Sequence, residues 1–205
     1  TWNWYDENLE IIEKNIESNI KKELIDNINC LESLIINKSF INSIKKVIKS
    51  IENCIDNNGK VIFAGNGGSF ADAQHLSAEF VSKLCTDRIP LPSLALGTNL
   101  SSTTAIGNDY GFEYIFSREL DAIANSKDLF LAFSTSGNSL NIIKAIEKCK
   151  EKSIKFFIFT GSSGGKCAEL FTNTIKVPSK NTAIIQQLHI TIGHIICKLS
   201  ENKFL

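Results

Sequence analysis

The sequence predicts an α/β fold with a central, mainly parallel sheet, preceded by an N-terminal helical arm. From residue 6 to about residue 57, apolar residues recur at helical spacing, and the first glycine of the chain is Gly59. After Gly59, short apolar runs alternate with helical patterns, as in strands joined by helical crossovers. We find no internal repeat and no low-complexity linker, so residues 1–205 are expected to form a single domain, with an arm over 1–57 and an α/β core over 58–205.

The arm is expected to contain two or three helices. Its first apolar face is formed by Ile11, Ile12, Ile16, Ile20 and Leu24. A break is expected near residues 37–39, with Ser39 as the N-cap of the following helix. The apolar faces must pack either on the rest of the domain or in a helical bundle between subunits, and the sequence favours neither.

The core is expected to contain five strands and five helices in alternation. The predicted strands cover residues 60–64, 92–97, 128–134, 155–161 and 174–178. The predicted helices cover residues 69–84, 111–124, 139–150, 164–171 and 182–202. Parallel strands joined in this way require right-handed crossovers.

Composition gives no support to several classes of partner. The chain has 22 Lys and Arg against 22 Asp and Glu, which removes the electrostatic reason to expect nucleic acid. No apolar run approaches the roughly 20 residues of a membrane span, and the start lacks the pattern of a signal peptide. The six cysteines lack C-x-x-C spacing, so we expect reduced, mostly buried thiols and a cytoplasmic location.

Three polar loops follow predicted strands, where parallel sheets bind ligands. The glycine-rich loop 65–69 suits an oxyanion at a helix N-terminus or a tight turn, and it matches neither a P-loop nor a dinucleotide fingerprint. Loop 134–139 carries four hydroxyls where a helix cap needs one, which favours a phosphate monoester. Loop 160–165 repeats the pattern more weakly, and capping of the next helix explains it equally well.

The three histidines offer a candidate metal or acid–base site. His75 and Glu79 lie one helical turn apart and can hold a divalent metal, exchange protons, or form a plain surface ion pair. In the apolar last helix, Gln186 and His194 lie about 12 Å apart along the axis. One metal reaches both only if the side chains converge, the helix distorts or different subunits contribute. His189 either orients a metal ligand or is a core histidine.

Several motifs occur together in one order and spacing. They are Gly65-Asn66-Gly67-Gly68-Ser69, Asp72-Ala73-Gln74-His75, Glu79, residues 107–112, residues 116–118, residues 134–139, and Ile185-Gln186 with His189 and His194. Over about residues 55–202 this pattern resembles the phosphoheptose (sedoheptulose 7-phosphate) isomerases of the sugar isomerase (SIS) superfamily.

The resemblance implies a flavodoxin-like three-layer αβα sandwich and a homotetramer with active sites at subunit interfaces. It implies one zinc ion per subunit, held by His75, Glu79, Gln186 and His194. The substrate would be bound by Asn66, Gly67, Gly68, Ser69, Glu79, Asn108, Asp109, Ser134, Thr135, Ser136, Ser139 and Gln186. The reaction would convert sedoheptulose 7-phosphate to D-glycero-D-manno-heptose 7-phosphate, on the way to bacterial lipopolysaccharide or capsule.

An aldose–ketose isomerisation suits these residue types. It moves a proton between C1 and C2 through an enediol, and it needs a base for carbon and an acid or Lewis acid for oxygen. We expect Glu79 and His194 to be the catalytic pair. A carboxylate bound to metal is a weaker base, so the roles of base and ligand compete at Glu79.

The chain departs from the family pattern at five positions. Ile184 and Gln187 replace a charge pair, Asn99 replaces an Asp, Lys83 replaces an Arg, and Phe70 replaces a small residue or His. A changed rim could fit another sugar phosphate, and an aminosugar-type isomerase is a weaker alternative.

The rival hypothesis from another class is a non-catalytic SIS-domain binding protein of the DiaA type, which associates with a replication initiator. His194 discriminates between the two, because a binding module has no need of it.

Overall fold

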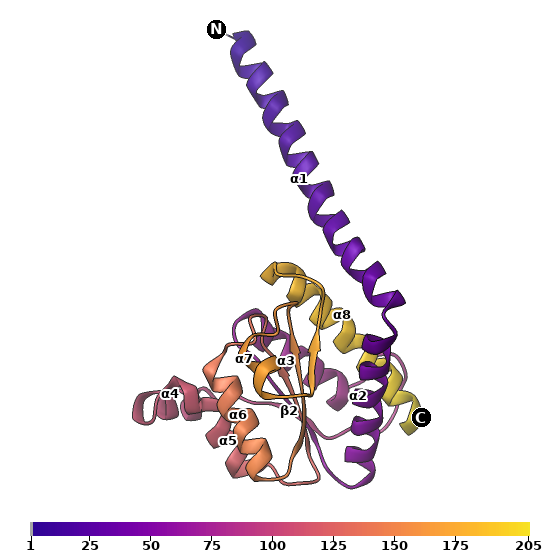
Figure 1. Ribbon diagram of the computed structural model, residues 1–205, viewed down its shortest axis with the longest axis vertical. Coiled ribbons are helices and arrows are strands. Elements are labelled where there is room, and N and C mark those ends of the chain that lie inside the picture. Colours follow the sequence, from indigo (N-terminus) through magenta and orange to yellow (C-terminus); the bar gives the residue numbers. More distant parts are fainter. Residues whose placement is uncertain (1) are drawn as a thin grey trace.

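The computed structural model describes residues 2–205, and the side chains from residue 14 onward. Its centre is a five-stranded parallel sheet in the order β2-β1-β3-β4-β5, with helices on both faces (Figure 1). The strands are β1 (Val61–Ala64), β2 (Ser93–Ala95), β3 (Leu129–Phe133), β4 (Lys155–Thr160) and β5 (Thr174–Lys176). This topology confirms the predicted α/β class, and all five strands lie within their predicted ranges.

The strand order reverses between β1 and β3. The chain moves outward from β1 to β2 and then returns to β3 on the other side of β1. The register pairs Ala64 with Ala132 and Phe133 with Phe159, so the carboxyl ends of β1, β3 and β4 lie nearly level. The loops after these strands therefore meet at the switch point, where such sheets bind ligands.

The arm consists of two helices, α1 (Trp2–Ile36) and α2 (Lys38–Asp56). The predicted break is present, but the predicted cap is wrong: Asn37 is the N-cap, and its Oδ1 accepts a hydrogen bond from Phe40 N at 3.0 Å. Ser39 lies inside α2, where its carbonyl accepts from the Ser43 hydroxyl. The predicted face at Ile11 and Ile12 lies outside the described side chains.

Helices α2, α3 (Gly68–Val81) and α8 (Thr182–Glu201) cover one face of the sheet. Successive side chains of a strand point to opposite faces, and this face receives the rings of Phe63, Phe133 and Phe159. Ring centroids lie 6.4 Å apart for Phe63–Phe133 and 5.1 Å apart for Phe133–Phe159. The aromatic row supports the helices that carry the candidate metal ligands.

Helices α5 (Ile115–Ile123), α6 (Leu140–Glu151) and α7 (Gly165–Leu170) cover the other face. The alternate strand residues Ile62, Phe130 and Ile158 form a second core cluster with them. The two clusters on either side of one sheet give the expected three layers.

Helix α4 (Leu100–Asp109) was not predicted as a helix. The Asn99 side chain caps it by accepting from Ser102 N at 3.3 Å. The predicted helix over 111–124 begins as a short 3₁₀ turn, η1 (Phe112–Tyr114), and continues as α5. A final 3₁₀ turn, η2 (Asn202–Phe204), follows α8.

All six cysteines, which lie within the described side chains, are free thiols, and four of them are buried. Burial raises the pKa of Cys54 and Cys167 to about 11, so these thiols stay protonated at neutral pH. Among the helices of the described residues, none combines the length and apolar character needed to cross a membrane.

Candidate active site

Three predicted site residues converge where α3 and α8 pack together. His75 Nε2 lies 3.2 Å from Glu79 Oε1 on α3 and 2.8 Å from His194 Nε2 on α8. One ligand atom from each residue falls within 4.8 Å of the others. The convergence occurs within one chain, so His75, Glu79 and His194 form a single cluster that we call the donor triad.

A glycine allows the two helices to come this close. A Cβ at Gly193, beside His194, would overlap the Leu76 side chain, which is fully buried on α3 beside His75. Glycine therefore sets the spacing between the α3 and α8 backbones next to the triad.

The donor triad fits a zinc ion by its chemistry. Two imidazoles and one carboxylate form a ligand set typical of zinc, whose catalytic sites use three protein ligands. At 2.8 Å, one ring nitrogen of the His75–His194 pair must donate and the other accept.

Gln186, the fourth predicted ligand, lies at the other end of α3. Its amide group packs against Gly68, in the glycine-rich loop. Gln186 thus connects that loop with the helix that carries His194.

His189 lies in the core beside the aromatic row. Its ring is fully buried, with centroids 5.6 Å from Phe133 and 6.2 Å from Phe159. Burial lowers its pKa to about 4, against a smaller opposing effect of the Thr160 backbone. Within the described residues, neither ring nitrogen has a hydrogen-bond partner of good geometry. Of the two predicted roles, this geometry fits the core histidine.

Asp72 lies on α3 one turn before His75. Burial raises its pKa to about 6, while the charge of His75 acts in the opposite direction. Its Oδ2 is buried without a hydrogen-bond partner among the described residues. This carboxyl group is therefore able to hold or release a proton near neutral pH, close to the donor triad.

The glycine-rich loop opens the N-terminus of α3. Gly67 is the N-cap with a positive φ of 57°, and both Gly67 and Gly68 are exposed. The Asn66 amide forms two reciprocal hydrogen bonds, of 2.8 and 2.9 Å, with the buried amide of Asn141 on α6. This amide pair joins the loop after β1 to the first turn of α6.

The hydroxyl-rich loop 134–139 has the composition and position of a phosphate site. Ser134 and Ser139 place their hydroxyl oxygens 3.0 Å apart. Ser139 is the N-cap residue of α6, yet within the described chain its side chain makes no capping hydrogen bond. Capping therefore does not account for this hydroxyl, and the loop ends at a helix N-terminus that attracts anions.

Loop 160–165 and the start of α7 hold the hydroxyl-rich loop through hydrogen bonds. Lys166 N donates to Asn138 Oδ1 at 3.0 Å, and Cys167 N donates to Gly137 O at 2.9 Å. Gly137 has a φ of 66°, and a Cβ there would overlap the Gly164 carbonyl. The first amides of α7 thus hold the second loop, and in the described chain α7 has no side-chain cap of its own.

Asn108 and Asp109 lie apart from the donor triad. They are exposed at the end of α4, which packs on η1 and α5 on the side of the core away from α2 and α8 (Figure 1). The Asn108 amide donates to Asp109 Oδ1 at 2.8 Å. The structure therefore does not bring these two predicted site residues to the donor triad of their own chain.

Comparisons with known proteins place this geometry in a family. A family profile described as the SIS domain matches residues 25–161. The phosphoheptose isomerase of Aneurinibacillus thermoaerophilus is 50% identical over 191 residues, covering 91% of this chain and 96% of the relative. The chain belongs to the phosphoheptose isomerase family.

Solved structures of the family share the fold. The phosphoheptose isomerase of Neisseria gonorrhoeae matches with a TM-score of 0.84 at 33% identity, covering 91% of this chain and 99% of that chain. That of Francisella tularensis matches with a TM-score of 0.85 at 32% identity, covering 90% and 97%. These matches favour the isomerase over the alternative of a non-catalytic binding protein.

The departures from the phosphoheptose isomerase pattern have local explanations. Asn99 caps α4, a role that Asn and Asp share. Ile184 is buried in the core and Gln187 is exposed. Phe70 packs its ring near Gly97, and Lys83 is exposed with its Nζ 3.4 Å from Asp87 Oδ1. The donor triad contains none of these five positions.

Sequence reasoning missed several residues that shape this isomerase site. Asn141 holds Asn66, and the only sequence signal was a polar residue on the buried face of a helix. Arg88 and Glu201 form a buried ion pair beside the last turn of α3. They are 113 residues apart in sequence, so no local pattern joins them.

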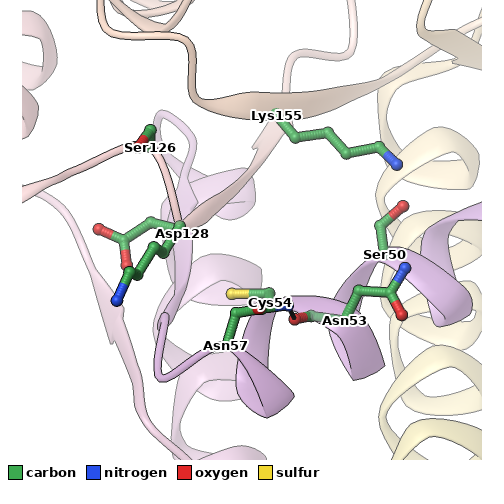
Figure 2. Close-up of a pocket in the computed structure, with 8 residues that line it drawn as sticks. Ser50, Asn53, Cys54, Asn57, Ser126, Asp128 and Lys155 are labelled. Carbon is green, nitrogen blue, oxygen red and sulfur yellow. Dashed lines mark hydrogen bonds between the residues drawn. The ribbon is translucent and has the colours of Figure 1, made fainter.

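A pocket at the opposite edge of the sheet is unrelated to this site. Figure 2 shows its lining by α2 and the amino ends of β3 and β4, including Cys54, Asp128 and Lys155. The Asp128 carboxylate accepts from Lys60 N and Lys60 Nζ and from Asn125 N. Its oxygens are thus occupied by the fold, and we assign it a structural role.

Proposed function

We propose that this chain is an aldose–ketose isomerase that converts sedoheptulose 7-phosphate to D-glycero-D-manno-heptose 7-phosphate, an early step toward nucleotide-activated heptose for bacterial lipopolysaccharide or capsule. The observation that carries this proposal is the convergence of His75, Glu79 and His194 within one chain of the phosphoheptose isomerase family. The hydroxyl-rich loop 134–139 follows β3, as loop 65–69 follows β1, and offers a place for a phosphate group.

The two loops divide the recognition of the substrate. The phosphate group binds to the hydroxyls of Ser134, Thr135, Ser136 and Ser139 and to the N-terminus of α6. The sugar hydroxyls bind to loop 65–69 through Asn66, Gly67, Gly68 and Ser69, with Gln186 against Gly68. The Asn66–Asn141 amide pair joins loop 65–69 to the first turn of α6, which follows the hydroxyl-rich loop.

Glu79 and His194 carry the proton transfers. Glu79 removes a proton from C1 of the ketose while His194 protonates O2, which gives the enediol. Return of the carbon-bound proton to C2 and loss of the O1 proton give the aldose. Glu79 suits the role of base because its carboxylate is largely shielded from solvent, with 16% of the side chain exposed, and points into the triad.

The resident metal is proposed to be zinc, one ion per subunit. His75, Glu79 and His194 hold it, and Gln186, two turns before His194, is the fourth ligand expected from the family resemblance. When bound, the ion supplies a Lewis acid for the carbonyl and hydroxyl oxygens of the substrate. If Glu79 binds the metal with one carboxylate oxygen, its second oxygen is still available to accept a proton. Glu79 can therefore act both as a metal ligand and as the base.

The assembly is proposed to be a homotetramer with active sites at subunit interfaces. Exposed apolar residues along α1 offer a surface for other copies. Asn108 and Asp109, which lie away from the triad of their own chain, would then act in the site of a neighbour. Free and largely buried cysteines fit the cytoplasm as the compartment of the reaction.

The direct test is turnover of sedoheptulose 7-phosphate by the purified protein, with zinc and with a chelator. We expect turnover that the chelator abolishes and zinc restores. Glu79→Gln and His194→Gln are expected to lower kcat by at least about 100-fold, the usual contribution of a general acid or base. Glu52→Gln, at a carboxylate on α2 that is 18% exposed and pairs with Lys49, is the matched control and should leave kcat unchanged.

Two results would contradict this proposal. A folded oligomer that turns over no sedoheptulose 7-phosphate in either condition would exclude the substrate and favour another sugar phosphate or a binding role. Turnover that survives both the chelator and the loss of Glu79 would exclude the assigned catalytic residues.

A further inference from the structure

We propose that Arg88 is a positioning residue that, through Glu201, fixes the end of α3 carrying Glu79 against the face of α8 carrying His194. This inference rests on the proposed function, in which Glu79 and His194 act at one site. It concerns two residues outside the donor triad, buried at the point where the two helices end.

The Arg88 guanidinium is almost fully enclosed and hydrogen-bonded. Its side chain is 1% exposed and that of Glu201 is 2% exposed. Arg88 Nε donates to Glu201 Oε2 at 3.2 Å, and the other carboxylate oxygen accepts from Cys85 N, also at 3.2 Å. Both oxygens of Glu201 are therefore engaged by the segment that follows α3.

The same guanidinium closes the C-terminus of α3. Arg88 Nη2 donates to the Glu79 carbonyl at 2.8 Å, and Nη1 donates to the Phe80 carbonyl at 2.9 Å and the Ser82 carbonyl at 3.2 Å. The last carbonyls of a helix have no partner within the helix, and a cation placed there is favourable. Arg88 thus supplies side-chain donors to the last turn, in addition to the backbone hydrogen bond from Leu91 N to the Phe80 carbonyl.

This contact matters because Glu79 lies in a part of the helix that would otherwise fray. Helix α3 ends at Val81, two residues beyond Glu79. The terminal turn of a helix is the part most prone to open. By binding the Glu79 carbonyl itself, Arg88 fixes the backbone from which the catalytic carboxylate projects.

Glu201 transmits the same constraint to α8. It is the last residue of α8 and lies seven residues after His194, which places both on one face of the helix. The guanidinium therefore contacts the backbone of Glu79 on α3 and a residue in line with His194 on α8. One side chain thus links the helix end that carries Glu79 to the helix that carries His194.

Stability alone does not explain why this pair is ionic. A buried ion pair often stabilises a fold no more than two apolar side chains of similar size. What the ion pair adds is geometry, because the planar guanidinium directs five donors along fixed directions. Four of the acceptors here are Glu201 and the carbonyls of Glu79, Phe80 and Ser82.

The decisive experiment removes both charges together. In Arg88→Met/Glu201→Leu no unpaired charge is left in the core, so we expect a folded oligomer. Binding of Co²⁺ alone, followed by its visible absorption, should weaken by about 10- to 100-fold, as when partners that orient metal ligands are lost. The kcat should fall by at least about tenfold, while KM changes by less than about threefold because loop 134–139 is untouched.

Two further variants separate geometry from charge and from stability. Arg88→Lys keeps the positive charge but loses the planar guanidinium and its fixed donor directions. The variant should retain less than about a third of the wild-type kcat. Lys60→Met removes the partner of buried Asp128, at the amino-terminal edge of the sheet, and leaves every hydrogen bond of Arg88 in place. It should lower the melting temperature yet leave Co²⁺ affinity and kcat unchanged below that temperature.

These experiments test the positioning role of Arg88 separately from the proposed function. A double variant with wild-type Co²⁺ affinity and kcat would overturn the positioning role, and so would an Arg88→Lys protein with full kcat. A wild-type protein that binds Co²⁺ but does not isomerise the heptulose phosphate would refute the proposed function. The comparison of Co²⁺ affinities would still decide the role of Arg88.

Discussion

At the scale of single residues, burial determines the charge state of His189. The ring packs beside Phe133 and Phe159 with no exposed surface, so protonation would place a charge in an aromatic environment. Its pKa falls from the ordinary value of 6.5 to about 4, because burial disfavours the charged form. His189 is therefore neutral at neutral pH.

This depressed pKa predicts acid sensitivity of the fold. Between pH 6.5 and pH 4, His189 is protonated in the unfolded chain but not in the folded chain. The free energy of unfolding therefore falls as the pH is lowered. The loss reaches about 3 kcal/mol, from about 1.4 kcal/mol per pKa unit. We expect His189→Leu to lack this component, measured as the difference between wild type and variant in urea unfolding at pH 7, 5.5 and 4.

Asp72 also makes stability depend on pH, so the contribution of His189 must be measured as a difference between wild type and His189→Leu. The pKa of Asp72 is raised from 3.8 to about 6, so its contribution has the opposite sign, and stability falls as the pH rises through that range. Asp72 is present in both proteins and cancels in the comparison. Parallel pH profiles for wild type and His189→Leu would contradict the prediction.

The residues of the site differ in how far the sequence predicts them. The spacing of His75 and Glu79 is local, because one helical turn brings them together wherever the helix lies. His194 joins them through packing of α3 on α8, and the sequence indicated it by its unusual place in an apolar helix and through the family resemblance. Arg88 and Glu201 meet only through tertiary structure, so the sequence contained no signal for the pair.

At the scale of elements, the packing of α3 on α8 determines the site. Both helices follow parallel strands and run in the same direction: Gln186 meets Gly68 at one end, and Glu201 meets Arg88 beyond the other. Gly193 and Leu76 lie in contact between these points. The donor triad lies beside this central contact, so its geometry depends on the distance between the helices.

A methyl group at Gly193 should separate the helices. Alanine gains about 1 kcal/mol of helix propensity over glycine, but overpacking a full core costs about 1–3 kcal/mol. We expect Gly193→Ala to lower the free energy of unfolding by about 1 kcal/mol and to weaken Co²⁺ binding, measured by urea unfolding and titration. Adding Leu76→Val should restore part of the stability and part of the Co²⁺ affinity, because the smaller side chain leaves room for the methyl group at position 193.

A second glycine provides the matched control for stability. Gly107 lies in α4 with open space where a Cβ would stand. Gly107→Ala should therefore raise the free energy of unfolding by up to about 1 kcal/mol. Stabilisation by Gly193→Ala to the same extent would show that the close helix contact exerts no strain.

The elements themselves were largely predictable, with two instructive exceptions. Strands and long helices show strong apolar periodicity. Helix α4 was missed because it has few apolar residues and is rich in Ser and Thr, which are typical of loops. The cap of α2 was misplaced because Asn37 and Ser39 are both good caps, and only the backbone geometry shows which one reaches the free amide.

At the scale of the whole molecule, α1 raises the question of what covers its apolar residues. The helix projects from the core (Figure 1), and exposed apolar side chains follow its length: Ile16, Ile20, Leu24, Ile28, Leu31 and Ile35. Isolated helices depend on packing of their apolar face for stability. The sequence left two alternatives for this face, and the exposure of these residues favours other copies of the chain over the core.

An oligomer would also complete the site. Asn108 and Asp109 lie on α4, on the side of the core away from the triad. Their role in substrate binding, expected from the family resemblance, then requires α4 of one copy to approach α3 and α8 of another. Assembly through α1 would thus be a condition for activity as well as a source of stability.

This link between assembly and catalysis predicts the effect of charge on the arm. In Ile20→Glu/Leu24→Glu, two carboxylates would lie in the apolar stripe, and their burial between copies would be too costly for the bundle to form. We expect sedimentation analysis to show a shift from tetramer to smaller species, with kcat reduced at least tenfold. Asn15→Glu, on the opposite side of α1, should change neither quantity. If the double variant were monomeric and fully active, catalysis would not depend on assembly. Asn108 and Asp109 would then not act in the site of a neighbouring copy.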